Sequence, residues 1–403
     1  MVGIFKNQDF QFGLSIVLGA VATHQADAGE ALAVADRIKD GDADSWVTEW
    51  TAAAGRARAI AEECEGKGHR LSARDAWLRA ATYYSVSLYA IAGSKQGGNF
   101  EQVWGQHRDC WDRAVRLFDP PLEPVSIPYE GTELEGYFFP AARGTGRRPL
   151  VILNNGSDGP VSAMWGQGGA AAVARGYHAL TFDGPGQNAA LIRQGLCFRP
   201  DWEAVIAPVV DYALARDDVD RDRIALLGVS QAGYWVPRAL AFEHRIAAGV
   251  ADPGVWDVGT TWRERLPKYM LRQLERDEKE KFNKNIERAE RFSKAMRAQL
   301  EFRMRPFGLE TPYDVYKALE AYTLDGVADQ IRCPMLICDP DHEQFWPGQS
   351  AQLYDALPGA KTLVRFTEEE GSDWHCEPRS PVIRDQRVFD WLDETLQVKP
   401  DPA

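Results

Sequence analysis

The first part of the chain alternates apolar and polar residues with a helical period. In the segment 72–92, SARDAWLRAATYYSVSLYAIA, the apolar side chains recur every three or four positions. Ser72 with Asp75 resembles a capping box and predicts the start of this helix. The segments 42–66, with Asp42 or Asp44 as its cap, and 99–118 follow the same pattern. We therefore predict an all-helical region over residues 1 to about 120, ended by the prolines of DPPLEP.

The pattern changes after residue 121 to short, continuous apolar runs. Two strands joined near Gly131 are predicted in 125–140, and further strands in 149–154, 177–182, 223–229, 246–252, 334–339 and 361–366. Helices are predicted between most of them, at 161–175, 201–216, 231–243, 348–357 and 381–396. Continuous apolar strands that alternate with helices indicate a mostly parallel sheet covered on both faces. Ligands of such sheets bind at the carboxyl ends of the strands.

One segment interrupts this alternation. Residues from about 257 to 326 are helical in pattern and strongly charged, as in RQLERDEKEKFNKNIERAERFSKAMRAQLEFRMRPFG. We interpret this segment as a helical cap inserted in the catalytic domain of residues 121–403, although a solvated peripheral helix pair gives the same pattern. The region 1–120 is then an N-terminal helical domain.

Composition excludes several classes of protein. The formal net charge is −13, which argues against nucleic acid and anionic membranes as partners. The six cysteines (Cys64, Cys110, Cys197, Cys333, Cys338, Cys376) form no CxxC pair, and the seven histidines are dispersed. We therefore expect no metal and no cofactor, and a reducing, cytoplasmic location. No apolar run reaches the roughly 18–20 residues that span a bilayer, and residues 12–28 indicate a partly buried helix rather than a signal peptide.

The run IALLGVSQAG, 224–233, ends in a serine between small residues. A nucleophile elbow needs small residues two before and two after its serine, because the strand-to-helix turn is tight. Gly228 and Ala232 meet that need, and the predicted strand and helix supply the context. Close helix packing is the other explanation for these small residues. We predict that Ser230 is a nucleophile.

A serine hydroxyl needs a base and an acid to activate it. His375, in GSDWHCEP, follows the last predicted strand and precedes the last helix, where this arrangement places its base. The acid is expected soon after the strand at 334–339. Counting back from FWPGQS favours Glu343, with Asp341 as the alternative.

Backbone N–H groups that stabilise an oxyanion are expected at two places. One is Gln231, directly after the nucleophile. The other is the loop NNGSDG, 154–159, where Gly156 and Ser157 are the candidates. The alternative explanation of this loop is that Asn154, Asn155 and Asp158 only close a turn. The segment FDGPGQ, 182–187, predicts a second turn at the mouth of the site.

The order Ser230, acid, His375, with GVSQAG, NNGSDG, FDGPGQ and HC, resembles the α/β-hydrolase superfamily. The motifs DGDADSWVTEW and GHRLSARDAWLRAATYY are similar to those of one branch, with 2,6-dihydropseudooxynicotine hydrolase, the fungal polyketide-shortening pigment hydrolases and FrsA-like proteins. The resemblance covers residues 10 to 396. It implies a triad of Ser230, Glu343 or Asp341, and His375, an N-terminal helical lid, a homodimer, and cleavage of esters or of C–C bonds next to ketones. A glutamate as acid departs from the aspartate usual in this branch.

These expectations combine into one function. The protein is expected to hydrolyse an ester, an amide or a ketone-adjacent C–C bond of a small molecule through an acyl-enzyme. Aromatic side chains abound in the first 120 residues, and any that face the cleft favour an aromatic or polyketide-like substrate. A C–C leaving group needs a further acid, for which Asp252 and Asp257 are available. The alternatives are an acyltransferase or cyclase with the same acyl-enzyme, and a non-catalytic regulatory binding protein.

Overall fold

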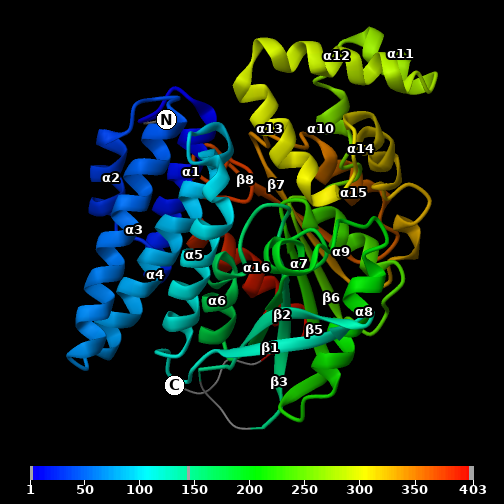
Figure 1. Cartoon of the computed structure of the whole chain (residues 1–403). Helices are drawn as coiled ribbons and strands as arrows, with labels where there is room; N and C mark the ends of the chain where they lie inside the picture. The colour runs from blue at the N-terminus through cyan, green and yellow to red at the C-terminus, as the bar shows by residue number, and fades with distance from the viewer. Residues whose placement is uncertain (1–2, 143–145, 399–403) are drawn as a thin grey trace.

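One eight-stranded sheet forms the centre of the structure (Figure 1). The computed structural model describes residues 3–142 and 146–398. The strands lie in the order β1-β2-β4-β3-β5-β6-β7-β8, where β1, β2 and β4 pair antiparallel and all other neighbours pair parallel. Their bounds are β1 Glu123–Tyr129, β2 Thr132–Phe139, β3 Arg148–Asn154, β4 His178–Phe182, β5 Val219–Val229, β6 Ala248–Asp252, β7 Met335–Pro340 and β8 Lys361–Phe366. Each predicted strand is confirmed, and so is the α/β class.

Among residues 3–122, five α-helices precede the sheet: α1 Gln8–Gly19, α2 Ala28–Arg37, α3 Ala43–Gly66, α4 Arg70–Ser87 and α5 Phe100–Val115. Asp42 caps α3 and accepts a hydrogen bond from the Ser45 N–H at 3.1 Å. The predicted cap at Ser72 is wrong, because α4 already begins at Arg70. Gly68, with φ of +73°, turns the chain sharply after α3, so the new helix starts earlier than the side-chain pattern indicates.

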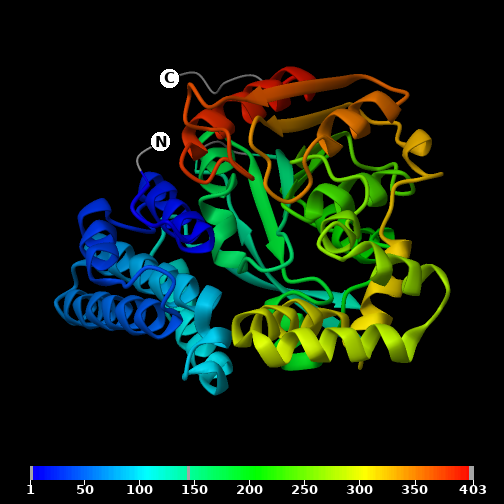
Figure 2. The same ribbon diagram turned by 90° about the horizontal axis from the view of Figure 1, so that it is seen from above.

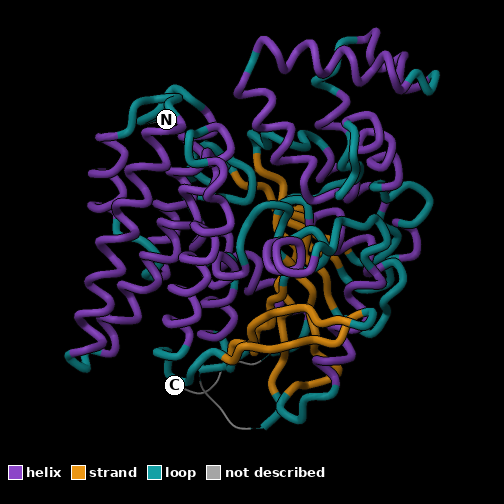
Figure 3. The backbone as a smooth tube through the Cα atoms, in the orientation of Figure 1, coloured by secondary structure: helices purple, strands orange, loops and turns teal. Residues whose placement is uncertain are grey.

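Helices cover both faces of the sheet (Figure 3). They are α6 Gly169–Ala174, α7 Asn188–Gln194, α8 Glu203–Leu214, α9 Ala232–Leu240, α15 Gln349–Ala356 and α16 Pro381–Thr395. The N-terminal helices, α6 and α16 contribute to the core on one face, whereas α8, α9 and α15 contribute to the core on the other. The predicted helix at 161–175 is wrong as a single element. It is a 3-10 helix, Val161–Trp165, followed by α6, because Gly168 takes a φ of +114° that a continuous helix excludes.

The charged segment between β6 and β7 forms five helices: α10 Thr260–Arg263, α11 Lys268–Glu275, α12 Lys279–Phe292, α13 Lys294–Met304 and α14 Pro312–Ala318. An isolated antiparallel β-bridge between Asp257 and Thr323 joins the two ends of this segment. The insertion has a small core of its own, which includes Phe282 and Tyr316.

The insertion and the N-terminal helices meet over one edge of the sheet, as the view from above shows (Figure 2). Phe100 packs near Phe302 with ring centroids 6.4 Å apart, and Arg305 pairs with Glu101 at 3.2 Å. No helix in the described ranges is long and apolar enough to cross a membrane.

Candidate active site

Ser230 lies on a sharp turn between β5 and α9. Its φ of +60° is left-handed, a conformation that costs a non-glycine residue energy and that nucleophile elbows share. A β-carbon on Gly228 would lie 2.4 Å from the carbonyl oxygen of Ala232, and one on Gly233 would lie 1.8 Å from that of Pro253. The small residues around Ser230 are therefore required by the turn itself, which presents the hydroxyl at the carboxyl end of the strand.

The structure brings together Ser230, His375 and Glu343 from three separate loops. His375 Nε2 lies 2.8 Å from Ser230 Oγ, and His375 Nδ1 lies 2.9 Å from both carboxylate oxygens of Glu343. The side chains of His375 and Glu343 are only 5% and 4% exposed, so their contact is shielded from water. The main-chain N–H of His375 donates to Gln344 Oε1 at 2.9 Å and fixes this loop.

Glu343 is held as a carboxylate. Burial alone would raise its pKa, but His375 and the N–H groups of Phe345 and Trp346 outweigh burial and hold the pKa of Glu343 below its usual value. Asp341, the alternative acid, lies elsewhere: it is exposed at the end of β7 and pairs with Arg365. The geometry therefore favours Glu343 over Asp341 as the partner of His375.

The loop after β3 runs directly against Ser230. A β-carbon on Gly156 would lie 2.7 Å from the Cβ of Ser230, so no larger residue fits there without a shift. The Gly156 N–H already donates to Asn155 Oδ1 at 2.8 Å. Within residues 3–142 and 146–398, no hydrogen bond uses the main-chain N–H of Ser157 or Gln231. Among the three predicted donors, these two are left free to receive a ligand oxygen.

Gln187, the last residue of FDGPGQ, fastens this loop. Its Nε2 donates to the carbonyl oxygens of Asn155 and Gly156, both at 2.7 Å, and its Oε1 accepts from the Gly184 N–H at 2.7 Å. Gln187 is fully buried. The sequence indicated only a Gly/Pro turn here, since nothing in the motif reveals which carbonyl groups a glutamine side chain reaches.

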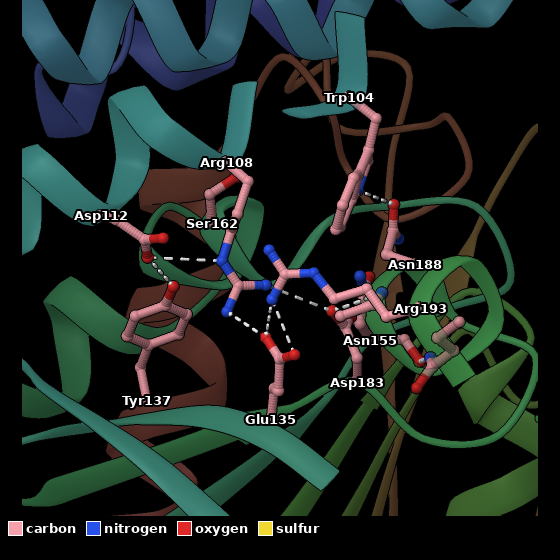
Figure 4. A network of polar contacts seen from close by, with 12 residues as sticks. Trp104, Arg108, Asp112, Glu135, Tyr137, Asn155, Ser162, Asp183, Asn188 and Arg193 are labelled. Atoms are coloured by element: carbon pink, nitrogen blue, oxygen red, sulfur yellow. Dashed lines mark hydrogen bonds and ion pairs between the residues drawn. The ribbon is translucent and has the colours of Figure 1, made fainter. Parts of the chain in front are cut away.

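A network of polar contacts joins the N-terminal helices to the same region (Figure 4). Arg108 of α5 lies 3.0 Å from Glu135 and 3.7 Å from the fully buried Asp183, whose pKa burial raises to about 6. Trp104 Nε1 donates to Asn188 Oδ1 at 3.1 Å, and Asn188 Nδ2 donates to the Gly159 carbonyl at 2.7 Å. The helix α5 is thus linked to the loop that contacts Ser230.

Ser230 and His375 open into a cavity of about 160 Å³. Its walls come from the N-terminal helices, the catalytic loops and the insertion, and its aromatic members are Phe12, Tyr89, Phe198, Trp262, Phe307, Phe345 and Trp346. A second cavity of about 70 Å³ follows the boundary between α1 and the sheet domain. The two share Ile16, Tyr89 and Gln167, among other residues, and so adjoin one another.

Most aromatic residues of the N-terminal region do not reach the catalytic cavity. Trp46, Trp50, Trp77 and Trp111 are fully buried within the helices, and Tyr89 is the one aromatic residue of the segment 42–118 among the described cavity walls. Phe12 of α1 packs near His375, with ring centroids 6.3 Å apart.

A pair of buried carboxyls lies behind the turn. The side chains of Asp252 and Glu377 are buried and lie within hydrogen-bonding reach of one another, and Arg384 is a nearby cation for both. Burial and then the neighbouring Asp252 raise the pKa of Glu377 well above its usual value, although Arg384 opposes this. Asp252 and Asp257 are absent from the described walls of the catalytic cavity, and Asp257 pairs with Arg263. In the described part of the chain, no three His, Cys, Asp or Glu side chains are grouped to hold a metal ion.

Comparisons with known proteins agree with this architecture. Hydrolase LUC6 of a Fusarium species is 31% identical over 415 residues, covering 99% of each chain. The 20-hydroxy-prefusarin hydrolase FUS2 of Gibberella moniliformis is 30% identical, again over 99% of each chain. The crystal structure of 2,6-dihydroxy-pseudo-oxynicotine hydrolase superposes with a TM-score of 0.73 at 21% identity, covering 95% of this chain and 98% of that one.

A further solved structure, AbyA5, gives a TM-score of 0.59 at 18% identity and covers 92% of this chain and 95% of that one. No protein-family model matches the chain. The identity of about 30% over nearly the whole length, together with the sheet order and the elbow, decides the assignment: the chain belongs to the α/β-hydrolases, in the branch that contains these fungal hydrolases.

Proposed function

We propose that the protein is a serine hydrolase that cleaves an ester, an amide or a ketone-adjacent C–C bond through an acyl-enzyme on Ser230. The observation that carries the proposal is the position of His375, whose two ring nitrogens lie 2.8 Å from Ser230 Oγ and 2.9 Å from Glu343. A buried imidazole between a hydroxyl and a carboxylate is the arrangement that makes a serine nucleophilic.

The reaction begins when Ser230 Oγ attacks the substrate carbonyl carbon and His375 takes the hydroxyl proton. Glu343 stabilises the imidazolium and keeps Nε2 directed at the serine. The N–H groups of Gln231 and Ser157 stabilise the oxyanion, and each such donor contributes roughly 3 kcal/mol. As the oxyanion collapses, the bond to the leaving group breaks, the leaving group takes the proton from His375, and the acyl group stays on Ser230. Water, activated by the neutral His375, then attacks the acyl-enzyme and releases the acid.

The cavity supports a mostly apolar substrate with aromatic or polyketide-like character. Aromatic rings line the chamber at Ser230, and the adjoining cavity along α1 gives room for a second, apolar part of the molecule. One relative is named for its action on 20-hydroxy-prefusarin, which agrees with a small-molecule substrate. The N-terminal helices, which contribute Phe12, Ile16 and Tyr89 to the walls, then act as a lid.

Labelling with a fluorophosphonate tests the nucleophile. We expect one adduct by intact mass on the wild type and none on Ser230→Ala. Ser157→Ala is the matched control, since it removes another hydroxyl of the same cavity and retains the main-chain N–H. A wild type that gains no adduct, and that also leaves a panel of small esters intact, contradicts the proposal.

A further inference from the structure

An arginine of the catalytic cavity has no part in the acyl-enzyme steps given above. Arg303 comes from the last turn of α13 in the insertion and lines the same cavity as Ser230 and His375. In the part of the chain that the structure describes, no carboxylate lies within 4.0 Å of its guanidinium, and no protein atom accepts a hydrogen bond from it. Its charge is therefore available to a ligand in the cavity.

The chain on both sides of Arg303 is fixed in place. Phe302 packs near Phe100 of α5, with ring centroids 6.4 Å apart. Beyond the end of the helix, the carbonyl oxygen of Pro306 accepts a hydrogen bond from the main-chain N–H of Phe198 at 2.8 Å. These contacts hold the last turn of α13 against two other segments of the protein, so Arg303 belongs to a built wall of the cavity.

The guanidinium of Arg303 is partly withdrawn from water. The residue is half-buried, and burial lowers its pKa, to which the nearby charge of Arg265 adds. Asp158 and Asp9 oppose this effect, but both lie beyond ion-pair distance. A guanidinium remains protonated at neutral pH, and a desolvated cation without a partner is costly. An anionic ligand atom beside Arg303 is therefore favoured.

The insertion that carries Arg303 is basic, although the chain as a whole is acidic. Residues 260–305 hold fourteen Lys and Arg against eight Asp and Glu, whereas the whole chain has a formal net charge of −13. A positive region on a negative protein raises the local concentration of anions and the rate at which they arrive. This charge distribution is a second observation that favours an anion at the cavity whose wall the insertion forms.

We propose that Arg303 forms a carboxylate-binding subsite of the catalytic cavity, and that the substrate is an apolar small molecule with one carboxylate group. This inference rests on the proposed serine hydrolase and names a feature of its substrate. The fork of a guanidinium offers two parallel N–H groups, which match the two oxygens of a carboxylate. The aromatic walls contact the apolar part of the molecule, and Ser230 attacks a carbonyl group elsewhere in it.

Matched esters separate this role from general damage. 4-Nitrophenyl 4-carboxybenzoate and 4-nitrophenyl 4-carbamoylbenzoate share their shape and leaving group, but only the first has an anionic acyl group. The mono-4-nitrophenyl ester of suberic acid and the corresponding ester of suberamic acid repeat the comparison with a longer, flexible acyl chain.

For Arg303→Gln we expect the ratio of kcat/KM, carboxylate to amide, to fall by about 10- to 100-fold in at least one pair, the scale of a charged hydrogen bond. Arg303→Lys retains the charge but not the fork, so its ratio should lie between the two. Arg297→Gln is the matched control and should keep the wild-type ratio, because Arg297 lies on the same helix but is exposed and pairs with Glu301 at 2.8 Å.

A binding measurement provides a readout that needs no catalysis. On Ser230→Ala, calorimetry should show that 4-phenylbutyrate binds at least about tenfold more tightly than 4-phenylbutyramide, and Ser230→Ala/Arg303→Gln should lose this difference.

Equal losses of kcat/KM on the carboxylate and amide esters, which a purely structural role would produce, overturn the inference. A preference for 4-phenylbutyrate that persists without Arg303 also overturns it. A wild type that labels at Ser230 and cleaves the amide esters, but has no carboxylate preference that depends on Arg303, overturns the inference while the proposed serine hydrolase stands. Carboxylate binding that depends on Arg303, in a protein that neither labels nor cleaves any ester, supports the subsite and contradicts the serine hydrolase.

Discussion

The main chain of Gly156 lies directly against the side chain of Ser230, so closely that a β-carbon on the glycine would lie 2.7 Å from the Cβ of the serine. The loop after β3 and the turn after β5 therefore form one rigid unit. This contact sets the distance between the Ser230 hydroxyl and the free N–H groups of Ser157 and Gln231.

Replacement of Gly156 by alanine tests that unit. The added methyl must displace Ser230 or the loop, and a displacement of about 1 Å at reacting atoms costs on the order of 100-fold in rate. We expect kcat/KM to fall by about that factor. Gly55→Ala is the control: nothing lies within 4 Å of its added methyl, and alanine stabilises a helix interior. Activity of Gly156→Ala near the wild-type value would show that the contact is not required.

Substitutions of the two candidate acids, Glu343 and Asp341, are expected to differ in their effect on kcat. Glu343→Gln retains the shape but removes the charge that fixes the His375 tautomer, and we expect kcat to fall by about 10³–10⁴-fold. Asp341→Asn, exposed and paired with Arg365, should remain near wild type. Steady-state kinetics on one ester, with thermal unfolding to verify folding, compares them. A large loss for Asp341→Asn alone would reverse the assignment.

Gln187→Leu tests a positioning residue. The leucine fills similar volume but releases the carbonyl groups of Asn155 and Gly156, so the loop loses its fixed position. We expect kcat to fall by about 10–100-fold while KM changes little, because the loss concerns transition-state geometry. Gln194→Leu, which removes a surface glutamine, is the control. A change confined to KM would indicate a role in substrate binding instead.

The length of the accepted substrate should depend on Ile16, which lines both adjoining cavities. In Ile16→Trp the larger ring closes the passage between them. We expect kcat/KM for long-chain or extended aromatic esters to fall by at least about tenfold, because a few methylene groups of the substrate lose their place in an apolar pocket. The kcat/KM for acetyl esters should not change. Ile60→Trp, at an exposed position of α3, should leave the ester profile unchanged. Parallel losses on short and long esters would contradict a two-part cavity.

Glu377 makes stability depend on pH. Its folded-state pKa is raised, so between about 4.3 and that higher value the folded state binds more protons than the unfolded chain. The free energy of unfolding then falls as pH rises through this window, by up to about 1.4 kcal/mol per unit. Glu377→Gln removes this contribution, so urea unfolding at pH 5, 6.5 and 8 should show a weaker decline. Identical declines would mean that Glu377 does not titrate there.

The sequence predicted the parts of the site that local sterics impose. Ser230 is predicted because its tight turn requires small residues at Gly228 and Ala232, and His375 is predicted because its loop follows the last strand. The helix at 161–175 and the cap at Ser72 failed for a common reason. Side-chain periodicity does not reveal where Gly168 or Gly68 turns the main chain.

The sequence does not show which residues from distant parts of the chain come together in space. Asp158 and Arg303 share a cavity only because the insertion folds over the sheet, and no local pattern encodes how it docks. The same holds for Gln187, whose role depends on which carbonyl groups of another loop come within 2.7 Å.

The candidate triad and part of the cavity wall come from different segments of the chain. Ser230, Glu343 and His375 sit on loops of the sheet, whereas Phe12, Ile16 and Arg303 come from helices added before or within it. We expect substitutions in these helices to change the shape of the cavity and to leave the contacts among Ser230, Glu343 and His375 in place. The shape of the cavity can therefore be altered at Phe12 or Ile16 without a change at any residue of the candidate triad.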